Sequence, residues 1–123
     1  MMKLLTVDDS MMVRKIICEA AHVLGIEPLQ AKDAQEALLV LEKHATEISV
    51  IVLDWNMPGM SGFELLQLLK ASPNYSKIPV IMVTTESHKT SIINAIKAGA
   101  ATYLTKPFAL QDLTTRIMQC LGM

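Results

Sequence analysis

Short apolar runs along the chain are separated by segments in which apolar residues recur at intervals of three and four. The first such segment lies between Ser10 and Gly25, and its apolar positions are Val13, Ile16, Ile17, Ala20, Ala21 and Leu24. These intervals are typical of a helix with one face inward, and Ser and Gly are common residues at helix ends. The spacing predicts a helix with those six positions inward. It leaves Cys18 off the inward face, as an ordinary free thiol.

Four more segments have helical spacing. Asp33 and Glu36 have the spacing of an acidic capping box, and we expect the helix after them to point Ala34, Ala37, Leu38, Leu41 and Ala45 inward. A third helix is expected from about Ser61-Gly62, broken at Ser72-Pro73-Asn74, and it carries Phe63, Leu65, Leu66, Leu68 and Leu69. The fourth is expected from about His88 to Ala98 and the fifth from Leu110 to Leu121.

The apolar runs between the helices predict five strands that alternate with the helices. Such a series is typical of an α/β domain in which a parallel sheet has helices on both faces. The run near Glu27 to Ala31 is the weakest and contains Pro28, so we expect an edge strand there. No linker, repeat or low-complexity segment interrupts the pattern, which predicts one domain over residues 1–123.

Polar residues follow four of these strands. Asp8 and Asp9 follow the first, Asp54 ends the third, Thr84 and Thr85 end the fourth, and Lys106 follows the fifth. Because parallel strands all end at the same edge of a sheet, we expect these side chains to lie close together, at the edge where such sheets bind ligands.

Three carboxylates at one edge repel each other unless a cation lies among them. Their hard oxygen atoms favour Mg2+ over zinc, and Mg2+ in proteins is commonly paired with phosphate. Lys106 would add a second positive charge for a phosphate, and Thr84 a hydrogen bond. Asp54 is then the natural nucleophile, since a carboxylate can form an acyl phosphate.

Composition excludes several other classes of protein. The chain has 123 residues, is 51% hydrophobic and has a net charge of −1, which argues against disorder, nucleic-acid binding and a basic membrane surface. Its apolar runs are too short to cross a membrane. Cys18 and Cys120 lack C-x-x-C spacing, so we expect a cytoplasmic protein.

Each polar residue also has a simple structural interpretation when taken alone. Acids and threonines after strands often cap the next helix, Asp is common in turns, and a lysine before proline is usually solvated. The interpretation as a site depends on all four strand ends occurring in one chain.

Taken together, four segments of the chain resemble the receiver domain of two-component response regulators. They are Val7-Asp8-Asp9-Ser10 with Arg14 following, Leu53 to Gly62, Val83-Thr84-Thr85-Glu86, and Tyr103 to Phe108. The resemblance covers the whole chain and is strongest to the single-domain chemotaxis, or CheY-like, type. It implies a flavodoxin-like fold with strand order 2-1-3-4-5.

The resemblance also implies roles for individual residues. Asp54 is similar to the phosphoacceptor, Asp8 and Asp9 are similar to the acids that bind Mg2+, and Asn56 would offer the metal its backbone carbonyl. Thr84 and Lys106 resemble the pair that contacts the phosphate.

Three further positions take their expected roles from the resemblance. Tyr103 resembles the switch aromatic that turns inward when the threonine moves. Asn56 and Glu86 lie at positions that set how fast water removes the phosphate, and an amide with a carboxylate implies a short-lived signal. The peptide bond between Lys106 and Pro107 is expected to be cis.

The implied function is that of a signalling switch. The protein would not be an enzyme, except that it would catalyse its own phosphorylation and dephosphorylation at Asp54. The expected donor is a sensor histidine kinase or a histidine phosphotransfer protein. The expected target is a protein such as a flagellar switch component, which would read a change in the surface of the fourth helix, fifth strand and fifth helix. We expect a monomer.

The alternatives to this function are a phosphorelay intermediate, or a receiver domain cut from a larger DNA-binding regulator. The absence of a linker after the fifth helix favours a stand-alone protein.

Two other classes fit the residues less well. A phosphohydrolase of the haloacid dehalogenase class has two Asp separated by one residue, whereas Asp8 and Asp9 are adjacent. A nucleotide- or flavin-binding module would need a glycine-rich loop, and the five glycines form neither G-x-G-x-x-G nor a Walker A loop.

Overall fold

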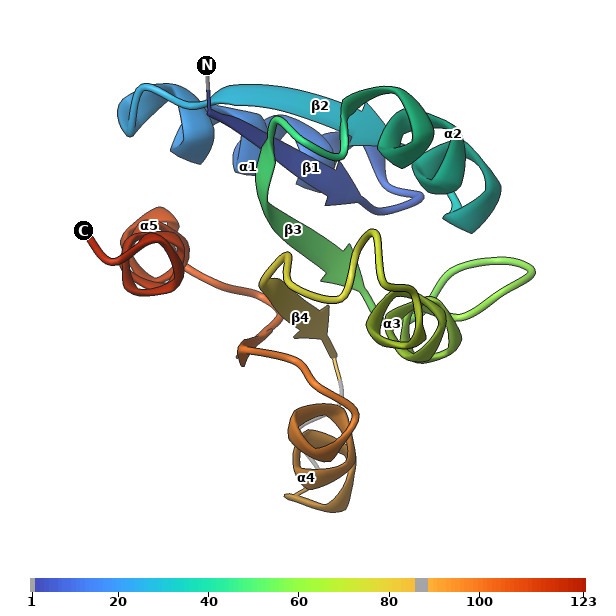
Figure 1. Ribbon diagram of the computed structural model, residues 1–123. Helices are drawn as coiled ribbons and strands as arrows, with labels where there is room; N and C mark the ends of the chain where they lie inside the picture. Colours follow the sequence, from blue (N-terminus) through green and yellow to red (C-terminus); the bar gives the residue numbers. More distant parts are fainter. Residues whose placement is uncertain (1, 86–88) are drawn as a thin grey trace.

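A single parallel sheet forms the centre of the molecule (Figure 1). The computed structural model describes residues 2–85 and 89–123. The strands are β1 (Lys3–Val7), β2 (Glu27–Ala31), β3 (Ile48–Asp54), β4 (Val80–Thr84) and β5 (Thr102–Thr105). Their order is β2-β1-β3-β4-β5, and every neighbouring pair is parallel. The predicted order is therefore confirmed, including the position of the strand with Pro28 at an edge.

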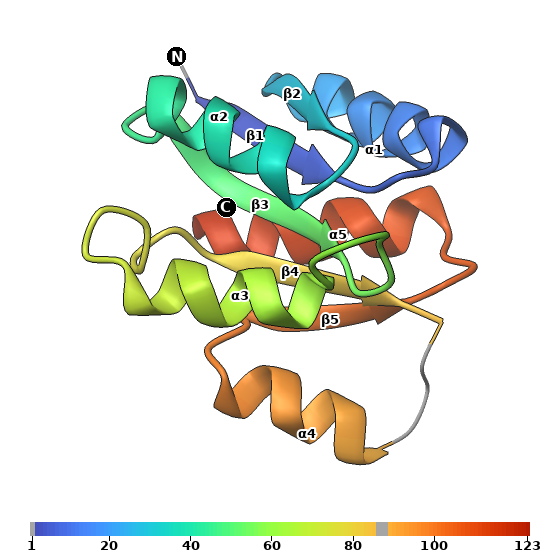
Figure 2. The same ribbon diagram turned by 90° about the vertical axis from the view of Figure 1, so that its right-hand side faces the viewer.

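Five helices cover the two faces of this sheet. They are α1 (Met11–Val23), α2 (Ala34–His44), α3 (Gly62–Ala71), α4 (Lys89–Lys97) and α5 (Leu110–Leu121). Helices α1 and α5 lie on one face, and α2, α3 and α4 lie on the other (Figures 1 and 2). The predicted start of the fourth helix, His88, lies outside the described residues.

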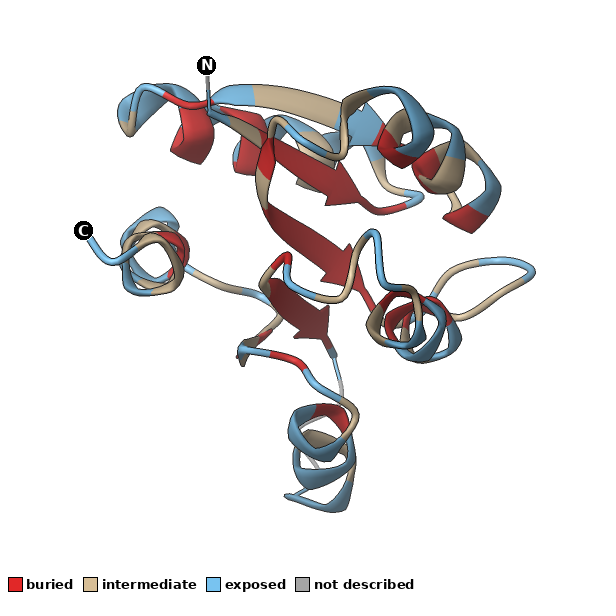
Figure 3. Cartoon of the chain, viewed as in Figure 1, coloured by how far each residue is buried: buried red, intermediate tan, exposed pale blue. Residues whose placement is uncertain are grey.

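Two apolar clusters fill the space between the sheet and the helices. The α1–α5 cluster includes Leu4, Ile17, Ala20, Ala21, Val50, Val52, Ile81, Val83, Leu104, Leu113 and Ile117. The α2–α4 cluster includes Leu5, Val7, Ala37, Leu41, Ile51, Leu53, Leu65, Leu66, Leu69, Val80, Met82 and Ala95. Successive residues of β1, β3 and β4 alternate between the clusters, because neighbouring side chains on a strand point to opposite faces. These central strands are buried on both sides (Figure 3).

Polar side chains cap three of the helices. The Ser10 hydroxyl accepts a hydrogen bond from the Val13 N–H, as expected for the start of α1. Ser61 and Glu64 form a complete capping box at the start of α3, which the sequence analysis did not identify. Asp33 accepts a hydrogen bond from the Glu36 N–H at 2.8 Å. The Glu36 carboxylate accepts from the Lys32 N–H at 3.2 Å, so this acidic capping box is displaced by one residue.

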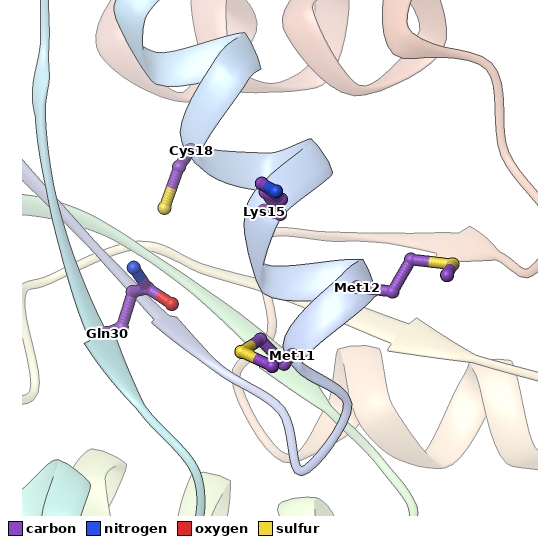
Figure 4. Close-up of a pocket in the computed structure, with 5 residues that line it drawn as sticks. All are labelled: Met11, Met12, Lys15, Cys18 and Gln30. Atoms are coloured by element: carbon purple, nitrogen blue, oxygen red, sulfur yellow. The ribbon is translucent and has the colours of Figure 1, made fainter.

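The prediction for α1 was wrong at two positions. Ile16 is 37% exposed, whereas Cys18 is only 9% exposed and belongs to the buried face. The buried face is centred on Ile17 and Ala21, and at 100° per residue Cys18 lies nearer to its middle than Ile16 does. The Cys18 side chain points toward Gln30 of β2, in a pocket of about 390 Å³ (Figure 4).

Leu68 of α3, one of the apolar residues of the predicted third helix, is 39% exposed. The buried residues of this helix are Gly62, Leu65, Leu66 and Leu69, and Leu68 lies about 110° from the middle of that face. In α1, spacing predicted the helix correctly but misplaced the edges of its buried face.

One buried hydroxyl has no hydrogen-bond partner within the described part of the chain. Thr6 of β1 is fully buried and its Oγ1 atom is unpaired. A buried polar group without a partner costs free energy of folding, because it gave up its hydrogen bonds to water.

We therefore expect Thr6→Val to raise the free energy of unfolding by about 1 kcal/mol, since the shape is kept and the unpaired hydroxyl is removed. Urea unfolding followed by circular dichroism measures the change. The exposed Thr46 offers a matched control, because Thr46→Val should change the free energy of unfolding by less than about 0.5 kcal/mol. A loss of stability in Thr6→Val would show that the hydroxyl is paired in solution.

Candidate functional site

The carboxyl end of the sheet brings two acids and a lysine to the same side. Residues two apart on a strand share a face. Leu4 lies four residues before Asp8, Val52 lies two before Asp54, and Leu104 lies two before Lys106. All three of these residues pack in the α1–α5 cluster. Asp8, Asp54 and Lys106 consequently project toward that side, where β1, β3 and β5 end. Backbone hydrogen bonds continue the ladders past the strand ends, from the Asp8 N–H to Ala31 and from the Lys106 N–H to Thr84.

The Lys106 ammonium group joins the two buried carboxylates. Its Nζ donates to Asp8 Oδ2 at 3.0 Å and to Asp54 Oδ1 at 3.0 Å. The side chains of Asp8 and Asp54 are only 2% and 4% exposed, whereas that of Lys106 is 20% exposed. A carboxylate this deeply buried needs a cation or several donors to remain charged. Lys106 provides the cation for both acids.

Burial and pairing change the acidity of these groups in a defined way. Burial raises the pKa of Asp54, and the charge of Asp8 raises it further, while hydrogen bonds from Lys106 and from the Asn56 N–H act in the opposite direction. Burial alone would lower the pKa of Lys106, but its hydrogen bonds to Asp8 and Asp54 outweigh burial and raise the pKa. Lys106 is therefore held in its charged form.

Asp9 completes a group of three acids. One carboxylate oxygen from each of Asp8, Asp9 and Asp54 lies within 4.8 Å of the others. Asp8 and Asp54 are buried, and Asp9 is exposed. An all-oxygen donor set with one side open to solvent fits Mg2+, which binds few carboxylates and keeps several waters.

Asp8 is held in place by more groups than the sequence analysis anticipated. Its Oδ1 accepts from the Ser10 N–H at 2.9 Å, and its Oδ2 accepts from Lys106. Arg14 donates through Nη1 to the Asp8 carbonyl oxygen at 2.6 Å and through Nε to Gln30 Oε1 at 3.0 Å. In the sequence, Arg14 belongs to one of the family motifs but has no assigned role. Its position one helical turn after Ser10 was the only signal of this contact.

The loop after Asp54 is fixed by close backbone contacts. The Trp55 N–H donates to the Val83 carbonyl at 2.9 Å, and the Gly62 N–H donates to the Trp55 carbonyl at 2.8 Å. A side chain at Gly62 would overlap the Asp54 carbonyl oxygen, so only glycine allows α3 to begin this close to β3. The Trp55 ring stacks on Phe63 with centroids 5.0 Å apart. Asn56 itself is exposed.

Thr84 and Tyr103 lie on the other face of the sheet from Asp54 and Lys106. Met82 pairs with Tyr103 and Thr84 pairs with Thr105. Met82 belongs to the α2–α4 cluster and Tyr103 packs against it, so alternation places Thr84 on that side as well. Thr84 is 2% exposed and Tyr103 is half-buried. Glu86, the expected second modulator, lies outside the described residues.

A cleft of about 290 Å³ lies next to Lys106 and is lined by Val13, Ile16, Thr85, Lys106, Pro107 and Phe108. The peptide bond between Lys106 and Pro107 is cis, as expected. The apolar residues of this cleft come from α1 and from the segment after β5, so the lysine is bordered on one side by apolar surface.

Comparison with known proteins gives the family. Residues 4–118 match the response regulator receiver domain. The chain is 43% identical to a chemotaxis protein CheY homolog of Campylobacter jejuni over 98% of this chain and 93% of that protein. It is 42% identical to chemotaxis protein CheY1 of Helicobacter pylori over 98% of each chain.

Solved structures agree with the sequence comparison. Chemotaxis response regulator CheY4 of Vibrio cholerae is 32% identical, with a TM-score of 0.89 over 98% of each chain. A chain of the CheX-CheY-BeF3-Mg complex of Borrelia burgdorferi is 25% identical to this chain, with a TM-score of 0.91 over 98% of this chain and 89% of that chain.

The chain belongs to the receiver domain family of response regulators and has its flavodoxin-like fold. Within that family it is CheY-like. It is therefore a phosphorylation-activated switch of two-component signalling, a signalling protein and not an enzyme in the usual sense. Among the described residues, no helix has the length and apolar character needed to cross a membrane.

Removing the Lys106 charge should destabilise the protein in a pH-dependent way. In buffer with a chelator, we expect Lys106→Met to lower the free energy of unfolding by about 3 kcal/mol at pH 7, because two buried carboxylates lose their cation. Without the hydrogen bond from Lys106, which opposes the effect of burial, the pKa of Asp54 rises further. The folded state then binds protons more readily than the unfolded state, and the loss should shrink as the pH falls toward 4.

Urea unfolding at several pH values measures this dependence. Lys77→Met is the control, since Lys77 is exposed and lies away from the acids in the loop before β4. An equal loss at every pH would mean that Lys106 contributes through packing and not through its charge.

Proposed function

We propose that Asp54 accepts a phosphoryl group from a phosphohistidine of a sensor histidine kinase or a histidine phosphotransfer protein. The observation that carries this proposal is a buried carboxylate, Asp54, that accepts a hydrogen bond from Lys106 and lies within 4.8 Å of two further acids. The Asp54 oxygen attacks phosphorus, the bond from phosphorus to the histidine nitrogen breaks, and an acyl phosphate forms. Residues 1–123 would act as a single domain in this phosphoryl transfer.

Asp8, Asp9 and Asp54, with the backbone carbonyl of Asn56, would hold Mg2+ at this edge. When bound, the metal neutralises negative charge that builds up between the carboxylates and the incoming phosphate. The grouping of three carboxylate oxygens supports this assignment. So does the Borrelia burgdorferi CheY, whose complex is described with Mg and BeF3.

Lys106 and Thr84 would bind the phosphoryl oxygens, one by charge and one by a hydrogen bond. Lys106 already donates a hydrogen bond to Asp54, so its ammonium group lies next to the position that a phosphoryl group on that carboxylate would take. Thr84 lies on the same face as Tyr103, so movement of Thr84 toward the phosphate would open space for the ring. Asn56 and Glu86 would set how quickly water removes the phosphate.

The output surface would be formed by α4, β5 and α5. Ala95 is the only buried residue among the nine of α4, so this helix can shift at a small cost in packing. The proposed target is a protein of the chemotaxis system, such as a flagellar switch component or a CheX-like protein. A role as a phosphorelay intermediate is the second candidate, because its donor chemistry at Asp54 would be the same. The switch would act as a monomer in the cytoplasm.

The fluorescence of Trp55 provides a direct test, because this residue follows Asp54 and is the only tryptophan. We expect the emission to change when Mg2+ is added, and to change again with beryllofluoride or acetyl phosphate. Asp54→Asn should abolish the second change. Asp112→Asn, an exposed site on α5, should leave both changes intact. A wild-type chain that responds to neither addition would refute the proposal.

The Lys106→Met variant separates metal binding from the switch. We expect it to bind Mg2+, since the three acids remain, but to need at least about tenfold more beryllofluoride for half of the response. The physical reason is the loss of a charge-assisted hydrogen bond to the phosphoryl analogue, which contributes about 1.5–3 kcal/mol. If Lys106→Met needs no more beryllofluoride than the wild-type chain, Lys106 does not bind the phosphoryl group.

A further inference from the structure

Arg116 of α5 contacts two successive residues of β5. Its Nη1 donates to Thr102 Oγ1 at 3.1 Å, and its Cζ lies 5.7 Å from the centre of the Tyr103 ring. A guanidinium within about 6 Å of a ring centre is attracted to the face of the ring. Arg116 therefore contacts both the residue that is expected to switch and the residue just before it.

The two contacts lie on opposite sides of the sheet. Thr102 and Tyr103 are adjacent on β5, so their side chains point to opposite faces. Tyr103 packs against the α2–α4 cluster, whereas Ile117, next to Arg116, belongs to the α1–α5 cluster. β5 is the last strand of the sheet. The contacts of the guanidinium with both residues therefore join the two faces across the free edge of β5.

The charge of Arg116 is directed to this contact. Among residues 2–85 and 89–123, no carboxylate lies within ion-pair distance of it. The flat guanidinium can donate in its plane to Thr102 while its positive charge is close to the ring, which a lysine ammonium cannot do in the same way.

We propose that Arg116 is a positioning residue that holds the Tyr103 ring in the conformation of the unphosphorylated chain. The inference rests on the proposed function, in which Tyr103 turns when Asp54 is modified. The contact occurs in the conformation where Lys106 is bonded to the free Asp54 carboxylate. A ring that turns inward leaves the guanidinium behind, and the lost attraction opposes activation.

The size of the effect follows from the strength of the contact. A cation over an exposed aromatic ring contributes a free energy that corresponds to a change of about two- to fivefold in an equilibrium constant. An interaction present in only one of two conformations shifts their ratio by that factor. Arg116 would therefore set the threshold of the switch without touching the phosphate.

The test is a beryllofluoride titration in Mg2+ buffer, read by Trp55 fluorescence, on four chains. These are wild type, Arg116→Met, Tyr103→Leu and the double variant. Arg116→Met should lower the half-saturating beryllofluoride concentration by about two- to fivefold. The same substitution in the Tyr103→Leu background should have no effect, because the ring is already gone. Thr102→Val, which removes only the hydrogen bond, should have a smaller effect than Arg116→Met.

A second measurement reports on the ring itself. Tyr75→Phe leaves Tyr103 as the only tyrosine, so fluorotyrosine labelling yields a single ¹⁹F resonance. Without beryllofluoride, Arg116→Met should move this resonance toward its position in the beryllofluoride-bound chain, whereas Arg116→Lys should move it less. A shift of this kind would not come from a general loss of stability.

Three results would overturn the inference. They are an unchanged or weakened beryllofluoride response in Arg116→Met, an equal effect of Arg116→Met with and without the Tyr103 ring, and a resonance that does not move. A wild-type chain with no beryllofluoride response would refute the proposed function itself, and the role of Arg116 with it. A normal wild-type response with an unchanged Arg116→Met response would refute the role of Arg116 alone.

Discussion

Two buried carboxylates that share one ammonium group are the constraint on which the rest of this molecule depends. Asp8 and Asp54 are 1% and 3% exposed, and at such positions an unpaired charge costs several kcal/mol. Lys106 binds both, but a single positive charge leaves this pair of acids, and Asp9 beside them, with an excess of negative charge. An added cation would therefore be favoured, and in the proposed function it would be needed before Asp54 takes up a second anion.

Much of this arrangement could be predicted from the sequence, because it depends on local spacing. Strand ends are recognisable from apolar runs, and parallel strands must end at one edge. The proximity of Asp8, Asp54 and Lys106 could therefore be predicted from the sequence. The edge position of β2 followed from Pro28, and the end of α1 from Gly25. These features depend on backbone rules that act over a few residues.

The features that could not be predicted depend on how whole elements pack. Whether Cys18 or Ile16 faces inward is decided by the rotation of α1 against β2, and spacing alone allows both. The bond from Arg14 to the Asp8 carbonyl depends on the height of that helix above the sheet. The contact of Arg116 with Tyr103 joins two elements around a free edge, and no local pattern records it.

The backbone after Asp54 has little freedom to move. Trp55 is bonded to Val83 on one side and to Gly62 on the other, and the first residue of α3 lies against the Asp54 carbonyl. Gly62 thus allows α3 to pack directly against the backbone of Asp54. In the proposed switch, a larger charge on Asp54 would then be accommodated by movement of β4, β5 and the thinly packed α4. A position that accepts only glycine would in this way set the direction of the proposed movement.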